Sequence, residues 1–177
     1  MKTAVIYKSK TGFTKKYADW LAEDLSADIF EVSGVDSSTL EKYDTIIYGG
    51  SLHATGIIGV GFLKKNIDKL KDKRVIVFAC GASPASEDVL SEVIMHNFTA
   101  EQQEQIKCFY LRGGFDYNKL PAFEKVLMTL FKWGIILKKK IKKDLNSDEI
   151  GMLEAYEKPA DFTERSNIEE IVAYVNS

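Results

Sequence analysis

Short apolar runs that alternate with amphipathic stretches constrain the fold of this chain more than any other feature. The run at 74–80 is apolar on both faces, and the near-continuous apolar residues at 46–48 fit the same description. Buried strands that are separated by helical patterns are typical of a parallel sheet built from βαβ units. The sequence therefore predicts an α/β fold, with a doubly wound parallel sheet of five strands. The predicted strands lie at 4–7, 29–32, 43–48, 74–80 and 106–111.

The C-terminal third departs from this alternation. Residues 120–137 have apolar side chains at helical spacing, and lysines dominate the end of that stretch at 138–143. A capping-box pattern at 166–169 predicts the start of a last helix. A length of 177 residues is typical of one domain. We therefore expect a single domain over 1–177, in which 115–165 is a helical and irregular basic insertion before the last helix.

Charge is distributed unevenly along the chain. The 24 basic and 26 acidic residues give a net charge of −2, which excludes a polycationic protein that binds nucleic acid. Within 119–143, however, eight lysines accompany one acid, a local charge of +7, and the remainder carries −9. Basic charge beside an apolar helix favours contact with an anionic membrane surface or a protein partner. The alternative is a helix packed on its own domain with solvated lysines.

The cysteines and the N-terminus indicate a compartment. Cys80 and Cys108 lie inside apolar runs and are expected to be buried thiols, which fits a reducing environment. No pair of them has metal-ligand spacing, so we expect no metal site. The sequence contains neither a signal peptide pattern nor an apolar run of about 18 residues. We expect a cytoplasmic protein that can associate with a membrane through residues 119–143. The sequence indicates no oligomeric state.

Loops rich in glycine and hydroxyl groups follow three of the predicted strands. Open α/β sheets bind ligands at the carboxyl ends of their strands. The loop at 9–14 places three hydroxyl groups and a glycine where a helix begins, which favours phosphate binding. Helix capping by Ser9 and Thr11 is the alternative, and the nucleotide patterns of P-loop and Rossmann proteins are absent from this loop. The loops at 49–56 and 81–86 are also small and polar, which suits a flat ligand.

Two of these loops resemble those of the flavodoxins. The pattern Ser9-x-Thr11-Gly12-x-Thr14 is similar to the flavodoxin phosphate loop, and Gly50-Ser51 is similar to the start of the second flavin loop. The resemblance covers the first 112 residues and implies strand order 2-1-3-4-5 with non-covalently bound FMN. By this resemblance, the residues around the FMN phosphate are Ser9, Lys10, Thr11, Gly12, Phe13 and Thr14. Those facing the flavin ring are Ser51, Leu52, His53, Ala54, Thr55 and Gly56, with Gly81, Ala82 and Ser83 on its other side.

The aromatic residues that usually enclose the flavin ring are missing from the second and third loops. Phe115 and Tyr117 are the nearest substitutes. Asp116 and Tyr117 are expected to shape the substrate entrance, and a turn is the alternative. His53, in the second loop, is the candidate catalytic residue, because a histidine at this place can hydrogen-bond the flavin or relay a proton. An exposed loop histidine is the alternative.

A narrower resemblance covers the start of the insertion. The segment Tyr110–Tyr117, followed by Leu120-Pro121 and a basic amphipathic helix, resembles the flavodoxin-like, quinone-linked protoporphyrinogen dehydrogenases. That family is membrane-associated and oxidises a porphyrinogen through FMN, passing the electrons to a quinone. The sequence departs from it at His53-Ala54, where the family tends to have an arginine and an aromatic residue.

These observations favour an FMN-dependent oxidoreductase that passes electrons between a small substrate and a quinone or other acceptor. A soluble flavodoxin-type electron carrier, with no substrate of its own, is the first alternative. A flavin-free interaction module is the second.

Overall fold

The computed structural model describes residues 1–120, 122–140, 153, 156 and 158–177. The chain divides into two compact units, which we describe separately. The first comprises Met1–Gly113 and Phe162–Ser177, and the second comprises Gly114–Asp161. Much of the irregular part of the predicted insertion, with Lys142 and Lys143 of the basic run, lies outside the described residues.

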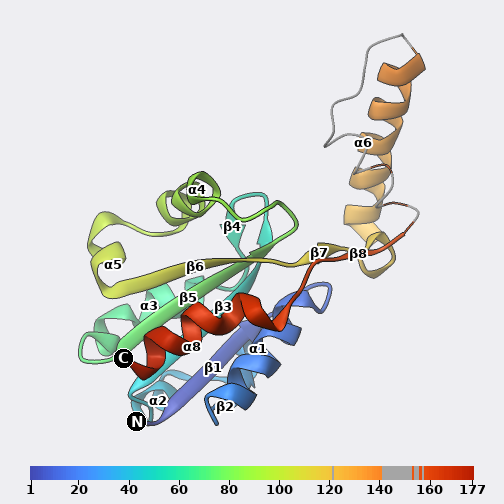
Figure 1. Ribbon diagram of the computed structural model, residues 1–177. Helices are drawn as coiled ribbons and strands as arrows, with labels where there is room; N and C mark the ends of the chain where they lie inside the picture. The colour runs from blue at the N-terminus through green and yellow to red at the C-terminus, as the bar shows by residue number, and fades with distance from the viewer. Residues whose placement is uncertain (121, 141–152, 154–155, 157) are drawn as a thin grey trace. The chain divides into compact units, whose positions relative to one another are not determined.

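The first unit is built on a parallel sheet. Its five parallel strands pair in the order β2-β1-β3-β5-β6, which confirms the predicted doubly wound fold and strand order (Figure 1). Apolar residues meet across the sheet, since Val5 pairs with Ile47 and Ile47 pairs with Ile76. The strands are β1 (Thr3–Lys8), β2 (Asp28–Glu31), β3 (Thr45–His53), β5 (Arg74–Gly81) and β6 (Ile106–Arg112).

Consecutive residues of the central strands β1, β3 and β5 enter separate cores on the two faces of the sheet. Ile46 of β3 belongs to a core with Leu63 of α3 (Gly61–Asn66) and Val93 of α4 (Glu87–Asn97). Ile47 belongs to the opposite core with Tyr17 of α1 (Phe13–Asp24). This alternation explains why the strands are apolar on both faces. The remaining helical segments of this unit are η1 (Val32–Gly34), α2 (Ser37–Glu41), η2 (Ile67–Leu70), α5 (Ala100–Gln105), η4 (Arg165–Ile168) and α8 (Glu169–Asn176).

The prediction that a loop begins at Gly49 is wrong. β3 continues to His53, and β4 (Gly56–Ile57) folds back on it as an antiparallel hairpin. The two glycines serve packing in the sheet. A Cβ atom at Gly49 would lie 2.1 Å from Cζ of Phe78, and one at Gly50 would lie 2.3 Å from Cγ2 of Ile57. The close approach of neighbouring side chains, and not a turn, therefore requires glycine at both positions.

The last helix also begins differently from the prediction. Residues Arg165–Ile168 form the 3-10 turn η4, and α8 has no side-chain cap, so the predicted capping box at 166–169 is wrong. Ile168 is fully buried in the core with α1. Arg165 forms ion pairs with Glu23 at 2.9 Å and with Asp24, both on α1. These tertiary contacts stabilise the 3-10 turn η4 at the place where the capping pattern predicted the first turn of a helix.

The second unit consists of a helix and a two-stranded stem. β7 (Gly114–Phe115) pairs antiparallel with β8 (Ala160–Asp161), and η3 (Tyr117–Lys119) leads into α6 (Ala122–Lys140). The helix predicted at 120–137 is thus confirmed, with the first part of its basic end. The ring of Tyr156 packs against Phe115 and Tyr117, at centroid distances of 5.8 and 5.3 Å. No helix within the described part of the chain is long and apolar enough to cross a membrane.

Candidate cofactor site

The first candidate element is the loop at 9–14, which joins β1 to α1. Gly12 adopts a φ of 98°, a left-handed conformation that strains any residue with a Cβ atom. Nothing lies within 4 Å of the place where that Cβ would stand, so the backbone and not the space requires glycine. The N-terminus of α1 has no side-chain cap. Within the loop, the Ser9 hydroxyl accepts a hydrogen bond from the N–H of Gly12 at 3.1 Å. Amides of a first helical turn have no partner within the helix, so the start of α1 is suited to bind a phosphate group.

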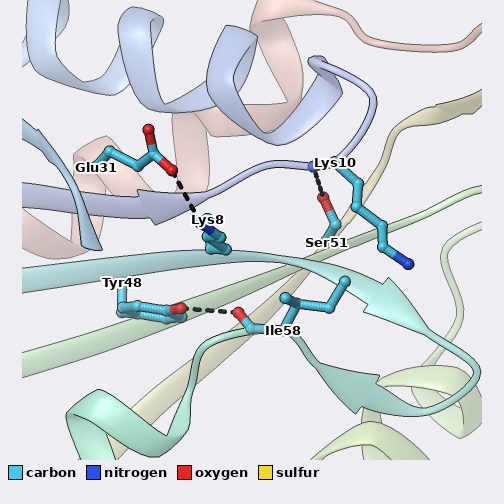
Figure 2. Close-up of polar contacts among 6 residues, drawn as sticks. All are labelled: Lys8, Lys10, Glu31, Tyr48, Ser51 and Ile58. Atoms are coloured by element: carbon cyan, nitrogen blue, oxygen red, sulfur yellow. Dashed lines mark hydrogen bonds and ion pairs between the residues drawn. The ribbon is translucent and has the colours of Figure 1, made fainter. Parts of the chain in front are cut away.

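Ser51 connects this loop to β3. Its hydroxyl accepts a hydrogen bond from the backbone N–H of Lys10 at 3.2 Å and shares a 2.8 Å hydrogen bond with the hydroxyl of Thr14. Figure 2 shows the bond to Lys10, whose side chain extends away from Ser51. Thr14 and Ser51 are both buried. The two hydroxyls therefore connect the loop and the start of α1 to β3. Thr11, next to Gly12, is half-buried.

Ile58, the residue after β4, is hydrogen-bonded to two residues of β3. The hydroxyl of Tyr48 donates to the backbone oxygen of Ile58 at 2.8 Å (Figure 2). The N–H of Ile58 donates to the backbone oxygen of Ser51 at 3.0 Å. Burial raises the pKa of Tyr48, so the phenol stays protonated and keeps this bond. At the tip of the hairpin, Ala54 adopts a φ of 51°. Left-handed backbone is uncommon for a residue with a Cβ atom.

A cavity of about 220 Å³ opens beside the hairpin. Tyr110 of β6 provides its one aromatic side chain, and the Tyr110 hydroxyl donates to the oxygen of Ser83 at 2.9 Å. Burial raises the pKa of Tyr110 to about 12, so its phenol remains a donor at neutral pH. The other lining residues are Leu52, Ala54 and Thr55 of the hairpin, Gly81, Ala82 and Ser83 after β5, and Val89, Glu92 and Val93 of α4.

Sequence reasoning missed Tyr110 because it lies within a strand and not in a strand-end loop. No local pattern marks Tyr110, whose partner on β5 is Ala79. Its place beside the cavity depends on packing, since a Cβ atom at Gly81 would lie 2.7 Å from the Tyr110 hydroxyl oxygen.

The structure brings together most of the residues predicted to face a flat ligand. Six of them line the cavity, from the hairpin and from the loop after β5. Ser51 and Leu52 are adjacent in β3, where Ser51 contacts the loop at 9–14 and Leu52, on the other face of the strand, lines the cavity. Gly56 pairs with His53 in the hairpin. His53 is exposed, and it does not belong to the described lining of the cavity.

Phe115, Asp116 and Tyr117 belong to the second unit, where they have their own partners. The carboxylate of Asp116 is buried, accepts a hydrogen bond from the N–H of Asn118 at 3.0 Å and lies 3.5 Å from the ammonium of Lys119. It therefore caps the turn η3. A role for these three residues beside a flavin stays a prediction.

The donor set of the site suits a phosphorylated ring compound and not a metal ion. Neutral hydroxyls and backbone amides at a helix start match a phosphate group, and the cavity with small residues and one tyrosine matches a flat ring. Among the described residues, no group of three or more histidine, cysteine, aspartate or glutamate side chains is arranged to hold a metal ion.

Comparison with known proteins gives the family. The family model described as a flavodoxin domain matches residues 4–144. An uncharacterized protein of Methanocaldococcus jannaschii is 25% identical over 130 residues, which cover 70% of this chain and 83% of that protein.

Solved structures are similar at low sequence identity. Oxidised flavodoxin 1 of Bacillus cereus is 22% identical with a TM-score of 0.46, over 63% of this chain and 84% of that one. Two-electron reduced flavodoxin of Megasphaera elsdenii is 15% identical with a TM-score of 0.47, over 68% of this chain and 88% of that one.

Proposed function

We propose an FMN-dependent redox function for this chain, which belongs to the flavodoxin domain family. One observation carries the proposal: the loop that begins α1 follows β1, and the cavity is lined by the end of β3 and the loop after β5, so both parts lie at the carboxyl ends of the parallel strands. The two parts match the two ends of FMN, a phosphate and a flat ring. Bound FMN supplies transfer of one or two electrons, and the protein supplies binding, orientation and electrostatics.

The residues of the site divide between these two ends. The Thr11 hydroxyl and the first-turn amides of α1 hold the phosphate, and Gly12 permits their close approach. The hairpin and the loop at 81–83 hold the ring, with Tyr110 at the cavity wall. His53, exposed at the end of β3, is our candidate for proton relay at the edge of the ring.

The activity we favour is that of an oxidoreductase, passing electrons between a small substrate and a quinone or other acceptor, like the protoporphyrinogen dehydrogenases that the insertion resembles. The absence of Phe, Trp and Tyr from residues 49–56 supports it, because a ring face without an aromatic cover is open to substrate. A soluble electron carrier is the second candidate.

The residues of the insertion support binding of the protein to an anionic lipid surface. α6 carries large apolar side chains that are exposed along one side, such as Phe123 at 79% and Leu130 at 65% exposure. Ile135, on the other side of the helix, is 4% exposed. A helix with an apolar side, lysines elsewhere and one acid is typical of helices that lie on membranes.

An absorbance spectrum of the purified protein, followed by flavin extraction and identification, tests the cofactor. We expect flavin bands and FMN in the extract, or uptake of FMN by the colourless protein. A protein that neither contains nor binds FMN would leave the interaction module as the function. Once FMN is bound, reoxidation of the reduced flavin by soluble quinones separates the oxidoreductase from a carrier that reacts only with protein partners.

A further inference from the structure

Asn97, the last residue of α4, is a buried polar side chain that the cofactor site described above does not use. It is 6% exposed, and its carboxamide is fully hydrogen-bonded. The side-chain oxygen accepts from the N–H of Ile57 at 2.9 Å. The side-chain nitrogen donates both hydrogens, to the oxygens of Thr55 and Val93, each at 2.7 Å. Among side chains of this size, only an amide combines one acceptor with two donors in this way.

The partners of Asn97 stand on two different walls of the cavity. Thr55 lines it from the hairpin, and Val93 lines it from α4. Ile57 lies in β4 and its Cγ2 atom packs over Gly50 in β3. The backbone oxygen of Asn97 also accepts from the ammonium of Lys64 on α3 at 2.8 Å. One side chain thus ties the hairpin wall to the helix wall.

The hairpin needs such a tie because its turn is strained. The turn consists of Ala54 and Thr55, and the φ of 51° at Ala54 suits glycine or asparagine better than alanine. A strained turn persists only where the surrounding structure holds it. The bonds from Asn97 to Thr55 and Ile57 hold the second residue of the turn and the strand that follows it.

We infer that Asn97 is a positioning residue that sets the distance between the hairpin and α4, and thereby the fit of a flat ring in the cavity. The inference rests on the proposed FMN function, because the ring in question is the flavin ring. Asn97 acts on the ring and not on the phosphate, since its bonds reach the cavity walls and not the loop at 9–14.

The test compares the wild type with Asn97→Ala and with the matched control Asn66→Ala. Asn66 also donates a side-chain hydrogen bond, to the oxygen of Phe62 at 2.8 Å, but it lies on α3 and does not line the cavity. Affinities for FMN and for riboflavin, which lacks the phosphate, are measured by quenching of flavin fluorescence. We expect Asn97→Ala to weaken both by the same factor, about tenfold or more, because three backbone groups, those of Ile57, Thr55 and Val93, lose the hydrogen bonds of the carboxamide. Asn66→Ala should leave both affinities nearly unchanged.

Two further variants keep the test decisive. Ala54→Gly relieves the turn, so it should restore part of the lost affinity when combined with Asn97→Ala. Asn97→Asp keeps the shape and the acceptor but lacks the donors. If Asn97→Ala fails to fold, the flavin affinities of Asn97→Asp are compared with those of the wild type instead. A loss confined to FMN, or equal affinities in folded Asn97→Ala, would overturn the inference.

Hydrogen exchange of the Ile57 amide in the flavin-free protein separates this inference from the proposed function. We expect faster exchange in Asn97→Ala than in the wild type. Unchanged exchange would show that Asn97 does not hold the hairpin. If the wild type binds neither flavin, the proposed function fails, while the exchange rates still decide whether Asn97 ties the hairpin to α4.

Discussion

At the scale of the residue, the hydroxyl of Thr11 is the group that we expect to contact the FMN phosphate most directly. Thr14 and Ser51 are bonded to each other, whereas Thr11 lies beside the left-handed Gly12 at the start of α1. Thr11→Ala removes a donor to a charged group, a loss of about 1.5–3 kcal/mol, or about 10- to 150-fold in affinity. Fluorescence titration should show this loss for FMN and not for riboflavin, and Thr11→Ser should restore it. Unchanged FMN affinity in folded Thr11→Ala would contradict the assignment.

Gly49 gives a second prediction at this scale, for stability. A Cβ atom there would lie 2.1, 2.5 and 2.7 Å from three atoms of the buried Phe78 ring. Gly49→Ala should therefore lower the free energy of unfolding by about 1–3 kcal/mol, the usual cost of overpacking a core. Gly61→Ala is the control, because nothing lies within 4 Å of the position of its Cβ. Denaturant unfolding of both variants checks this, and equal stabilities would mean that the sheet gives way without cost.

At the scale of the element, α6 gives a prediction about lipid binding. Each lysine near an anionic surface contributes about 1 kcal/mol, and salt screens that contribution. Anionic vesicles should therefore sediment the protein at low salt and release much of it at high salt. Replacing Lys138 and Lys139 by Gln should weaken sedimentation about 30-fold, and replacing Lys15 and Lys71 should not. The exposed apolar residues of α6 are Phe123, Val126, Leu127, Leu130, Trp133 and Leu137.

Trp133 reports whether the apolar side of α6 enters the lipid. Its fluorescence should shift to the blue on vesicle binding, measured in a Trp20→Phe background because Trp20 is the second tryptophan. If the wild type ignores anionic vesicles at low salt, the lipid surface is not the partner of α6. A protein partner would then fit the helix better, and the electron carrier would be the stronger functional candidate.

At the scale of the whole molecule, the two units give a prediction about independence. The first unit contains the five parallel strands, both cores and the candidate site. Its two segments meet where the N–H of Phe162 donates to the oxygen of Gly113 at 2.8 Å. A short glycine-serine linker in place of 114–161 should therefore leave the fold and FMN affinity intact, and abolish vesicle binding. Circular dichroism and flavin titration check the shortened chain, and loss of FMN binding in a folded product would place part of the flavin site in the insertion.

Local chemistry explains how far the sequence alone reaches. Apolar runs such as 74–80 predict buried strands because every second side chain must enter one of two cores. The loop at 9–14 predicts a phosphate site because hydroxyls, a glycine and a helix start stand within six consecutive positions. Neither prediction needs a distant residue. The strands, their alternation with helices and the first candidate loop could therefore be predicted from the sequence.

Tertiary structure decided what depends on contacts between distant residues. Gly49 belongs to a strand and not to a loop because it pairs with Tyr7 of β1 and with Phe78 of β5. The hairpin is hydrogen-bonded to α4, because the N–H of Ile57 donates to the side chain of Asn97, 40 positions away in the sequence. Residues Arg165–Ile168 form a 3-10 turn where a capping pattern predicted the start of a helix. The reason is tertiary, because Arg165 forms ion pairs with α1 and Ile168 is buried in the core. Sequence by itself determined the layers and the first loop because these follow from periodicity and local donors, whereas the walls of the cavity depend on packing that no local pattern contains.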